Sequence, residues 1–284
     1  MITAKKLAGL AAAALVALPL SACVNQQAAE TGGEPAGEGG GEGVTIGIKF
    51  DQPGLGLREG DTYTGFDVEV AKYVANELGY SEDQIEFVES PSAQRETLLS
   101  SGQVDMIFAT YSITDTRKEQ VSFAGPYIIA GQDLLIRADD TSITGPDSLS
   151  GKTLCSVTGS TPAEKVKEEY PEVELQEYPG YSQCVQALST GGVDAVTTDN
   201  TILAGFAAQE QYAGQLKVVG QTFSEERYGV GIPKGDVDLC NQINDALTSM
   251  VDSGAWQTAL DETLGASDFQ VDTSVNPPEF DTCS

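Results

Sequence analysis

The sequence lacks histidine altogether, and only 15 of its 284 residues are lysine or arginine, against 43 aspartates and glutamates. Without histidine the chain cannot build a Ser-His-Asp or Cys-His catalytic site, and it lacks the commonest zinc ligand. We therefore expect no catalytic residues, no metal site and no cofactor. The formal net charge of −28 argues against nucleic acid as a partner. An anionic ligand would have to meet a local cationic pocket.

Long hydrophobic runs are also scarce, apart from one near the start. Residues 7–20 are apolar, follow Lys5 and Lys6, and are too short to span a bilayer comfortably, which favours a signal peptide over a buried helix. The run ends in Leu20-Ser21-Ala22-Cys23, which resembles the bacterial lipobox, in which the cysteine is acylated. We expect a signal peptide at 1–22, a palmitate-bearing Cys23, and anchoring to the extracellular face of the cell membrane.

A second segment is poor in every large apolar residue. Residues 26–43 are rich in glycine and glutamate and contain no aromatic side chain, so they cannot bury enough surface to order themselves. With the lipidated cysteine they form a predicted flexible tether over residues 23–43.

The rest of the chain alternates strand and helix signals, which predicts α/β layers. Asp67 is placed to cap a helix that continues to residue 78, and Pro162 falls in the first turn of another. Residues 51–63, which hold Pro53 and three glycines, read as a loop. The predicted strands are 44–49, 85–88, 104–109, 153–157, 173–175, 193–197 and 216–219. The other predicted helices are 93–99, 183–188, 202–209, 239–251 and 256–264.

Two extended apolar segments, 127–137 and 228–232, separate these elements into two sets and would cross between them. This arrangement predicts two lobes, with residues 44–133 plus 227–284 forming lobe 1 and residues 134–226 forming lobe 2. Ligands of such sheets bind beyond the carboxyl ends of the strands. We therefore expect the site in a cleft between the lobes.

Five cysteines need an assignment. If Cys23 carries lipid, four remain, and an even number in an exported chain indicates two disulfides with three alternative pairings. We favour Cys155–Cys184 and Cys240–Cys283, because each pair then lies within one lobe.

Several segments, in order and spacing, resemble the family 3 bacterial solute-binding proteins, which are polar amino-acid receptors of ABC importers. The segments are 65–71 (GFDVEVA), 101–106 (SGQVDM), 114–117 (TDTR), 123–127 (FAGPY), 158–160 (TGS) and 192–199 (GVDAVTTD). Together they cover the chain from about 44 to 265. The resemblance implies a two-lobed periplasmic-binding-protein-like fold of type II. The lipobox and residues 48–57 (IKFDQPGLGL) are most similar to glutamate-binding lipoproteins of actinobacterial type.

The resemblance also assigns residues to the two charges of an α-amino acid. Arg117 falls where the family places the arginine that grips the α-carboxylate with a bidentate fork. Thr110, Ser112 and Thr158 fall at further positions that contact this carboxylate. The alternatives are a surface helix arginine for Arg117 and a turn threonine for Thr158.

Asp199, which follows a buried-looking strand, falls where the family places the carboxylate for the ligand's ammonium group, with Thr198 beside it. Asp199 could equally be the N-cap of the helix that follows, and the two roles are compatible.

The same resemblance points to the residues that select the ligand's side chain. Lys49, Ser92 and Arg95 fall where receptors for acidic amino acids place groups against the distal carboxylate. The alternative is that the two cations are exposed and screen an acidic surface. Arg58 and Arg227 remain unassigned. Some acidic-amino-acid receptors add a second-lobe histidine, which this chain lacks.

We therefore expect a monomeric binding protein, not an enzyme, that delivers an acidic amino acid, glutamate before aspartate, to the permease subunits of an ABC importer. Two other functions use the same cleft. One is a sensor that presents the amino acid to a membrane kinase, and the other is a dehydratase of cyclic acids, which would need a general acid or base that we do not find.

Overall fold

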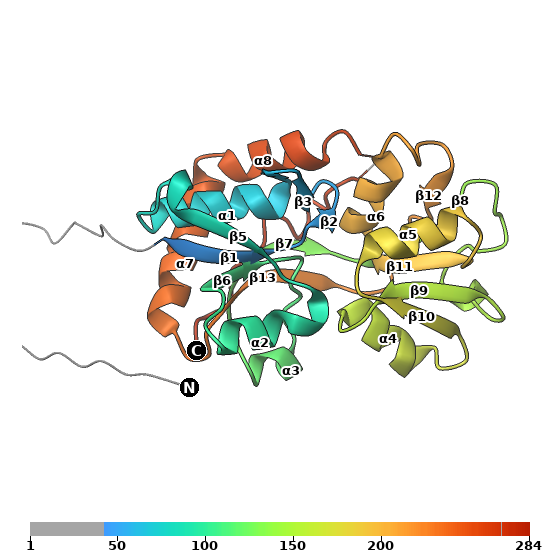
Figure 1. The fold of residues 1–284 in the computed structure, drawn as a ribbon, viewed down its shortest axis with the longest axis horizontal. Helices are drawn as coiled ribbons and strands as arrows, with labels where there is room; N and C mark the ends of the chain where they lie inside the picture. Colours follow the sequence, from blue (N-terminus) through green and yellow to red (C-terminus); the bar gives the residue numbers. More distant parts are fainter. Residues whose placement is uncertain (1–42, 268) are drawn as a thin grey trace, which may run out of the picture. The chain divides into compact units, whose positions relative to one another are not determined.

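The chain from residue 43 on is built around two five-stranded mixed sheets and one small antiparallel sheet (Figure 1). The structure is a computed structural model that describes residues 43–284 except residue 268. The predicted signal peptide, Cys23 and the tether lie outside the described residues. Among the described helices, none combines the length and apolar character that a membrane span requires.

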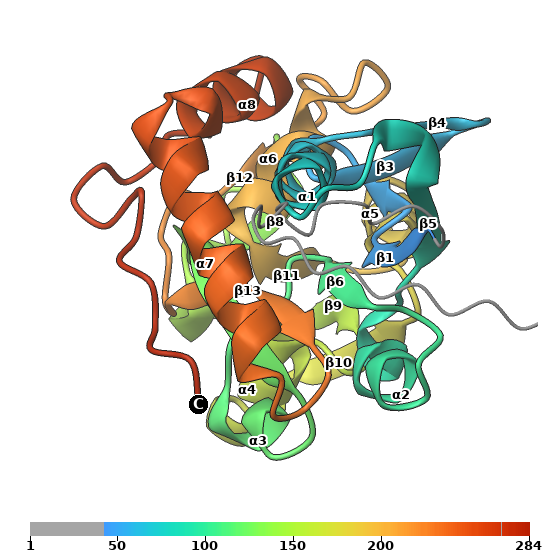
Figure 2. The same ribbon diagram turned by 90° about the vertical axis from the view of Figure 1, so that its left-hand side faces the viewer.

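The first sheet has the strand order β5-β1-β6-β13-β7, with β1 parallel to β5 and β6, and β13 antiparallel to β6 and β7. Its strands are β1 Val44–Ile48, β5 Ile85–Glu89, β6 Met106–Phe108, β7 Ser122–Ala130 and β13 Glu226–Ile232. The helices of this part are α1 Phe66–Glu77, α2 Arg95–Ser100, α3 Asp115–Lys118, α7 Val237–Asp252 and α8 Ala255–Leu264, with short 3₁₀ turns η1 Glu82–Gln84 and η2 Ser92–Gln94. In Figure 2, α7 and α8 lie on one side of this sheet and α2 on the other. We call this part the first lobe.

The second sheet has the order β10-β9-β11-β8-β12 and forms the second lobe. Its strands are β8 Gln132–Arg137, β9 Thr153–Val157, β10 Glu174–Tyr178, β11 Ala195–Asp199 and β12 Leu216–Val218, and its helices are α4 Thr161–Glu169, α5 Tyr181–Ser189 and α6 Asn200–Ala208, with the 3₁₀ turn η3 Pro146–Ser148. The two-lobed α/β architecture predicted from the sequence is confirmed. The predicted boundaries at residues 134 and 226 stay a prediction, because the described residues form one compact unit.

The predicted extended segment 127–137 is divided between the two sheets at Gly131. A Cβ at Gly131 would lie 2.8 Å from the Cβ of Thr222, so only glycine lets the neighbouring chain pass here. The second crossing is β13, which pairs with β7 from Glu226 onward.

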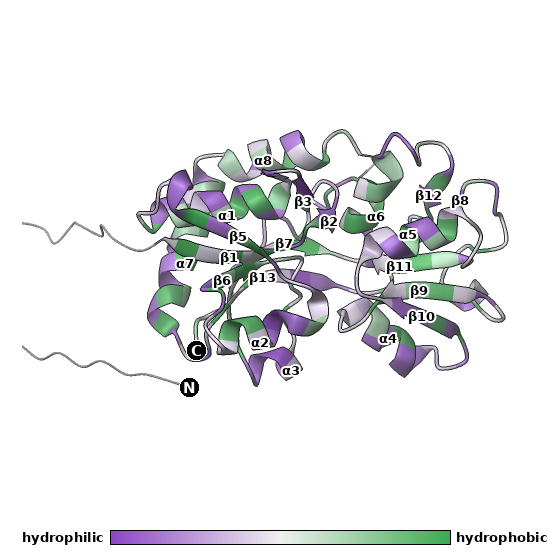
Figure 3. Cartoon of the chain, viewed as in Figure 1, coloured by the Kyte–Doolittle hydropathy of each residue, from purple (hydrophilic) through white to green (hydrophobic). Residues whose placement is uncertain are grey.

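The strands could be predicted from their apolar residues because they lie in the cores of the two lobes. The residues of β6 and nearly all of β7 and β11 are buried, as expected for strands covered on both faces. Figure 3 shows hydrophobic residues concentrated on the strands and on the inward faces of the helices. The indole of Trp256 on α8 donates to the carbonyl of Tyr127 at 2.8 Å and ties this helix to β7.

The region 51–63, which we predicted to be a loop, forms the third sheet instead. Strands β2 Asp51–Gln52, β3 Gly56–Glu59 and β4 Thr62–Thr64 pair antiparallel in the order β2-β3-β4. The strands are too short, and too interrupted by glycine, to show an alternating pattern. Arg58 belongs to this sheet, where its guanidinium lies 5.3 Å from the ring centre of Phe50.

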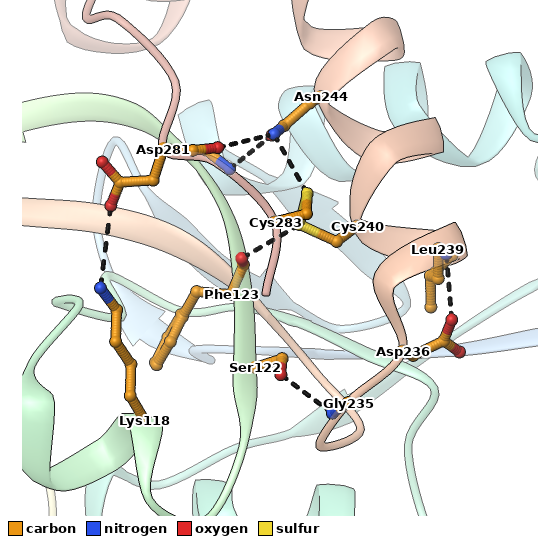
Figure 4. Close-up of a disulfide and its surroundings, with 11 residues drawn as sticks. Lys118, Ser122, Phe123, Gly235, Asp236, Leu239, Cys240, Asn244, Asp281 and Cys283 are labelled. Carbon is orange, nitrogen blue, oxygen red and sulfur yellow. Dashed lines mark hydrogen bonds and ion pairs between the residues drawn. A yellow bond between two sulfur atoms is a disulfide. The ribbon is translucent and has the colours of Figure 1, made fainter.

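Both predicted disulfides are present. Cys155 of β9 is bonded to Cys184 of α5, with Cα atoms 5.6 Å apart, and Cys240 of α7 is bonded to Cys283 of the C-terminal segment, with Cα atoms 5.8 Å apart. Figure 4 shows the second disulfide beside Asn244, whose amide nitrogen donates to the carbonyl of Asp281 at 3.1 Å.

The carboxylate of Asp281 also forms an ion pair of 2.7 Å with Arg227 of β13. The arginine that sequence reasoning could not assign therefore fastens the C-terminal segment to a crossing strand.

Candidate functional site

A narrow cavity of about 10 Å³ lies between the two lobes. The first lobe contributes Ser92, Arg95 and Thr110, from the segments that follow β5 and β6. The second lobe contributes the segments that follow β9 and β11 together with the first turn of α5. The cavity thus lies beyond the carboxyl ends of the parallel strands, as the α/β pattern predicted.

Thr110 enters this cavity in a conformation that is rare for a residue with a side chain. Its φ is +45°, in the left-handed region. Its backbone N–H donates to Oδ2 of Asp67 at 2.8 Å, and its hydroxyl donates to Gln52 at 3.2 Å. These bonds hold the strained backbone in place.

The role of Asp67 corrects our prediction that it caps a helix. The N-cap of α1 is Gly65, and the carboxylate of Asp67 instead accepts hydrogen bonds from Thr110 and from the hydroxyl of Tyr127. Burial raises the pKa of Asp67 to about 6. The carboxylate of Asp67 is fully buried and accepts from these two donors, so it holds Thr110 in place at the cavity and does not cap the helix.

The cationic side of the cavity is formed by Arg95. Its side chain is buried at 2% exposure and lies 4.1 Å above the ring centre of Tyr111. Nη1 donates to the carbonyl of Ala109 at 3.0 Å, whereas Nε has no hydrogen-bond partner within residues 43–267 and 269–284. Burial, with the Arg117 charge adding to it, lowers the pKa of Arg95 to about 10.

Lys49 lies behind Ser92 rather than at the cavity wall itself. Its ammonium donates to the hydroxyl of Ser92 at 2.8 Å, and only 5% of the residue is exposed. Burial, reinforced by repulsion from Arg95, lowers the pKa of Lys49 well below its ordinary value. In the described part of the chain, no carboxylate oxygen lies within 4 Å of either cation. Neither cation forms an ion pair among these residues, although the charges of Asp51 and Asp67 act to raise the pKa of Lys49. Both residues are buried, which contradicts the alternative that they are exposed.

The anionic side of the cavity is Asp199, at the end of β11. It stands at the N-cap position of α6, but its side chain makes no capping hydrogen bond. Oδ2 accepts from the hydroxyl of Tyr228 at 2.6 Å, and Oδ1 has no partner among the residues that the structure describes. Burial, and then repulsion from Glu226, raise the pKa of Asp199 well above its usual range. The neighbouring Thr198 is 1% exposed, and its hydroxyl is also without a described partner.

Arg117 and Ser112 lie beside the cavity and connect the lobes. Arg117 donates from Nη1 to the carbonyl of Ser112 at 2.7 Å and from Nη2 to the carbonyl of Gly159, in the second lobe, at 3.1 Å. The hydroxyl of Ser112 donates to Glu226 at 2.5 Å, and Thr161 of the second lobe donates to the same oxygen at 2.8 Å. The hydroxyls of Ser112 and Thr161, from opposite lobes, thus converge on the carboxylate of Glu226.

Thr158 is the one predicted residue that the structure leaves outside this group. It is exposed on the turn after β9, and Ser160 and Thr161 line the cavity in its place. Gly159 has a φ of +76°, and a Cβ there would lie 2.8 Å from the Cα of Ala93. This turn directs Thr158 to solvent and the next two side chains inward.

Sequence reasoning also missed Thr161, Tyr181 and Glu226. Tyr181 follows a Pro-Gly pair, which marks a turn at the edge of the lobe, and Glu226 is an acidic residue at the start of a crossing strand. A Pro-Gly turn and an acidic residue at a strand start are both common, so neither indicates a binding site until the fold places these residues between the lobes.

Comparison with known proteins decides the family. Residues 44–266 match the bacterial extracellular solute-binding proteins, family 3. The chain belongs to this family. The predicted resemblance is therefore confirmed, and membership identifies a family 3 solute-binding protein rather than an enzyme.

Individual relatives agree with this assignment. The glutamate-binding protein GluB of Corynebacterium efficiens is 49% identical over 93% of this chain and 92% of its own. The ABC transporter glutamine-binding protein GlnH of Bacillus subtilis is 33% identical over 75% of this chain and 78% of its own. Among solved structures, an ancestral arginine-binding protein bound to arginine matches with a TM-score of 0.73 and 32% identity, over 78% of this chain and 98% of that one.

Proposed function

We propose that this family 3 protein binds an acidic amino acid, glutamate before aspartate, and delivers it to an ABC importer. The observation that carries the proposal is the charge pattern of the cavity. Buried Arg95 lines one side, with buried Lys49 behind Ser92, and neither forms an ion pair within 4 Å among the described residues; buried Asp199, also without an ion pair there, lines the other side. Isolated buried charges are costly, so a ligand that carries the opposite charges in the same order would relieve both.

Each group of the ligand has a partner in this arrangement. The ammonium group would bind Oδ1 of Asp199. The distal carboxylate would accept from Nε of Arg95 and from the hydroxyl of Ser92, with the ammonium of Lys49 behind it. The α-carboxylate would bind Arg117, and the hydroxyl of Ser112 would donate to it only after releasing Glu226.

Similarity to a known protein supports the choice of glutamate. The glutamate-binding protein GluB of Corynebacterium efficiens is 49% identical to this chain. A neutral amide would leave the two cations unpaired, which favours glutamate over glutamine.

Contacts between the lobes support a closing mechanism. Besides the Arg117–Gly159 bond, the carboxylate of Asp51 accepts from the backbone N–H and the hydroxyl of Ser182, each at 3.1 Å. A ligand that contacts both walls makes more contacts in the closed protein than in the open one, and so it favours the closed protein. The importer would recognise this closed form.

The attachment of the protein belongs to the same proposal. We propose a monomer, divided into the two lobes at residues 134 and 226, that is held at the extracellular face of the membrane by acylated Cys23. The supporting feature is the lipobox-like tetrapeptide after an apolar run. Mass spectrometry of the protein from its native membrane should find a mature chain that begins at Cys23 with an acyl mass increment. An unmodified N-terminus elsewhere would reject the anchor.

A thermal-shift screen of the twenty amino acids on the purified protein tests the ligand class. Glutamate should raise the melting temperature most, followed by aspartate, because a ligand that binds only the folded state stabilises it by an amount that grows with the logarithm of its affinity at a fixed concentration. A larger shift with a neutral or basic amino acid would reject the proposal.

A further inference from the structure

The ring of Tyr111 lies against both arginines that the proposed function assigns to the ligand. Tyr111 is fully buried in the first lobe and does not line the cavity. The guanidinium carbon of Arg95 lies over this ring at 4.1 Å from its centre, and that of Arg117 at 5.1 Å. Both distances fall within the ~6 Å over which the face of an aromatic ring attracts a cation. One side chain behind the cavity therefore contacts both cations.

The ring of Tyr111 is fixed by its own packing. A Cβ at Gly231 on β13 would lie 2.6 Å from Cε1 of the ring, so glycine leaves the room that the ring occupies. Phe123 of β7 packs edge-on against it, with ring centres 4.8 Å apart. Its hydroxyl donates to Oε1 of Glu96 at 2.7 Å, and burial raises the pKa of Tyr111, so the phenol keeps this hydrogen.

Two guanidinium groups held close together repel each other. Burial lowers the pKa of Arg95, and the charge of Arg117 lowers it further. A carboxylate placed between the two arginines would relieve this repulsion, but it would also accept their hydrogen bonds and compete with the ligand. The face of an aromatic ring attracts cations without taking up their donors in this way. Nε of Arg95 accordingly has no hydrogen-bond partner among the residues that the structure describes.

Glu96 shows where Arg117 would go without the ring. Oε1 of Glu96 lies 3.5 Å from Nε of Arg117, and this same oxygen accepts the hydroxyl of Tyr111. A full ion pair between an arginine and a carboxylate has shorter bonds, of about 2.7–2.9 Å. The phenol therefore occupies an oxygen that could otherwise draw Arg117 away from the ligand.

We infer that Tyr111 is a positioning residue, whose ring holds the guanidinium groups of Arg95 and Arg117 ready for the two carboxylates of the ligand. The inference rests on the proposed function and adds a residue that does not line the cavity. Without the ring, Arg95 would move away from the charge of Arg117, and Arg117 would pair more closely with Glu96. The ligand would then have to draw both groups back, so its affinity would fall.

The first test compares wild type with Tyr111→Leu, Tyr111→Phe and the control Phe123→Leu. Phe123 belongs to the same buried cluster as Tyr111, and no guanidinium group in the described part of the chain lies over its ring. Calorimetry should show about a 5- to 30-fold loss of glutamate affinity for Tyr111→Leu and less than about a threefold loss for Tyr111→Phe, which keeps the ring. The control should bind as wild type does.

The inference would be wrong if a folded Tyr111→Leu protein bound glutamate normally. It would also be wrong if Phe123→Leu lost as much affinity as Tyr111→Leu, because the loss would then reflect general damage to the core. An equal loss in Tyr111→Phe and Tyr111→Leu would assign the effect to the hydroxyl and not to the ring.

A second test changes the electron density of the ring and keeps its shape. Phenylalanine carrying one, two or three fluorine atoms replaces Tyr111, because fluorine withdraws electron density from the ring face and weakens its attraction for cations. Glutamate affinity should fall with each added fluorine, whereas the same series at Phe123 should show no trend. A flat series at Tyr111, with wild type binding normally, would overturn this inference alone, even if Tyr111→Leu did not fold. Failure of wild type to bind glutamate would overturn the proposed function and this inference together.

Discussion

Replacing Asp199 by asparagine should abolish tight binding while leaving the fold intact. Asparagine keeps the shape of the side chain and can still accept the hydrogen bond that Tyr228 donates at 2.6 Å. It removes the charge that faces the ligand's ammonium group. Removing one partner of a desolvated charge pair costs roughly 2–5 kcal/mol, which corresponds to about a 30-fold to several-thousand-fold loss of affinity.

The same substitution should stabilise the ligand-free protein. The pKa of Asp199 is raised by burial and by Glu226, so the folded protein binds this proton more tightly than the unfolded chain does. Stability therefore falls as pH rises from the unfolded-state pKa, about 3.9, through the folded-state pKa, and the penalty is fully present above it. The neutral amide of the Asp199→Asn protein carries no such penalty, so the melting-temperature advantage of the variant should grow as pH rises through this window.

Asp133→Asn is the matched control. Asp133 is also a buried carboxylate of the second lobe, but it accepts from the backbone N–H groups of Leu134 at 2.7 Å and Gly220 at 3.0 Å and lies outside the cavity between the lobes. Its substitution should leave glutamate affinity unchanged. Calorimetry and thermal melts of the three proteins measure affinity and stability. Near-wild-type affinity in a folded Asp199→Asn protein would refute the assignment.

Three further predictions use the same assays. Lys49→Met and Arg95→Met should each weaken glutamate far more than glutamine, because the lost cation serves only a charged side chain; an unchanged ratio of the two affinities would show that neither cation reads the ligand. Arg117→Ala should cost at least ~30-fold in affinity, since the proposed α-carboxylate partner is lost, and a folded variant that binds normally would exclude that role. Replacing Cys240 and Cys283 together by serine should remove on the order of 3 kcal/mol of stability on the loop-entropy model without changing affinity; a denaturation midpoint equal to that of wild type would contradict this.

Helices and strands that are marked by a local sequence feature, such as an apolar run or a proline at a helix start, could be predicted from the sequence. The strand at 153–157 matches β9 residue for residue, and Pro162 indeed falls in the first turn of α4. These succeeded because buried strands read as continuous apolar runs and proline is favoured at a helix start. The cysteine pairs followed from the lobes, since each pair closes within one of them.

The errors arose where distant residues override a local preference. An aspartate at a helix start is usually a cap, but Asp67 bonds to Thr110, 43 residues away. Thr158 matched a family position, yet the direction of its side chain depends on the left-handed Gly159 and its close approach to the first lobe. Glu226 and Tyr181 were missed because their positions at the cleft depend on how the two lobes meet, which no local pattern encodes.

The central claim is that the cavity is built for a second carboxylate. Calorimetric titration of the wild-type protein with glutamate and with glutamine, at neutral pH and at two salt concentrations, tests it most directly. We expect tighter binding of glutamate at both concentrations, with little change between them, because the charges pair in a site closed to solvent. Glutamine binding as tightly as glutamate, or more tightly, would contradict the claim.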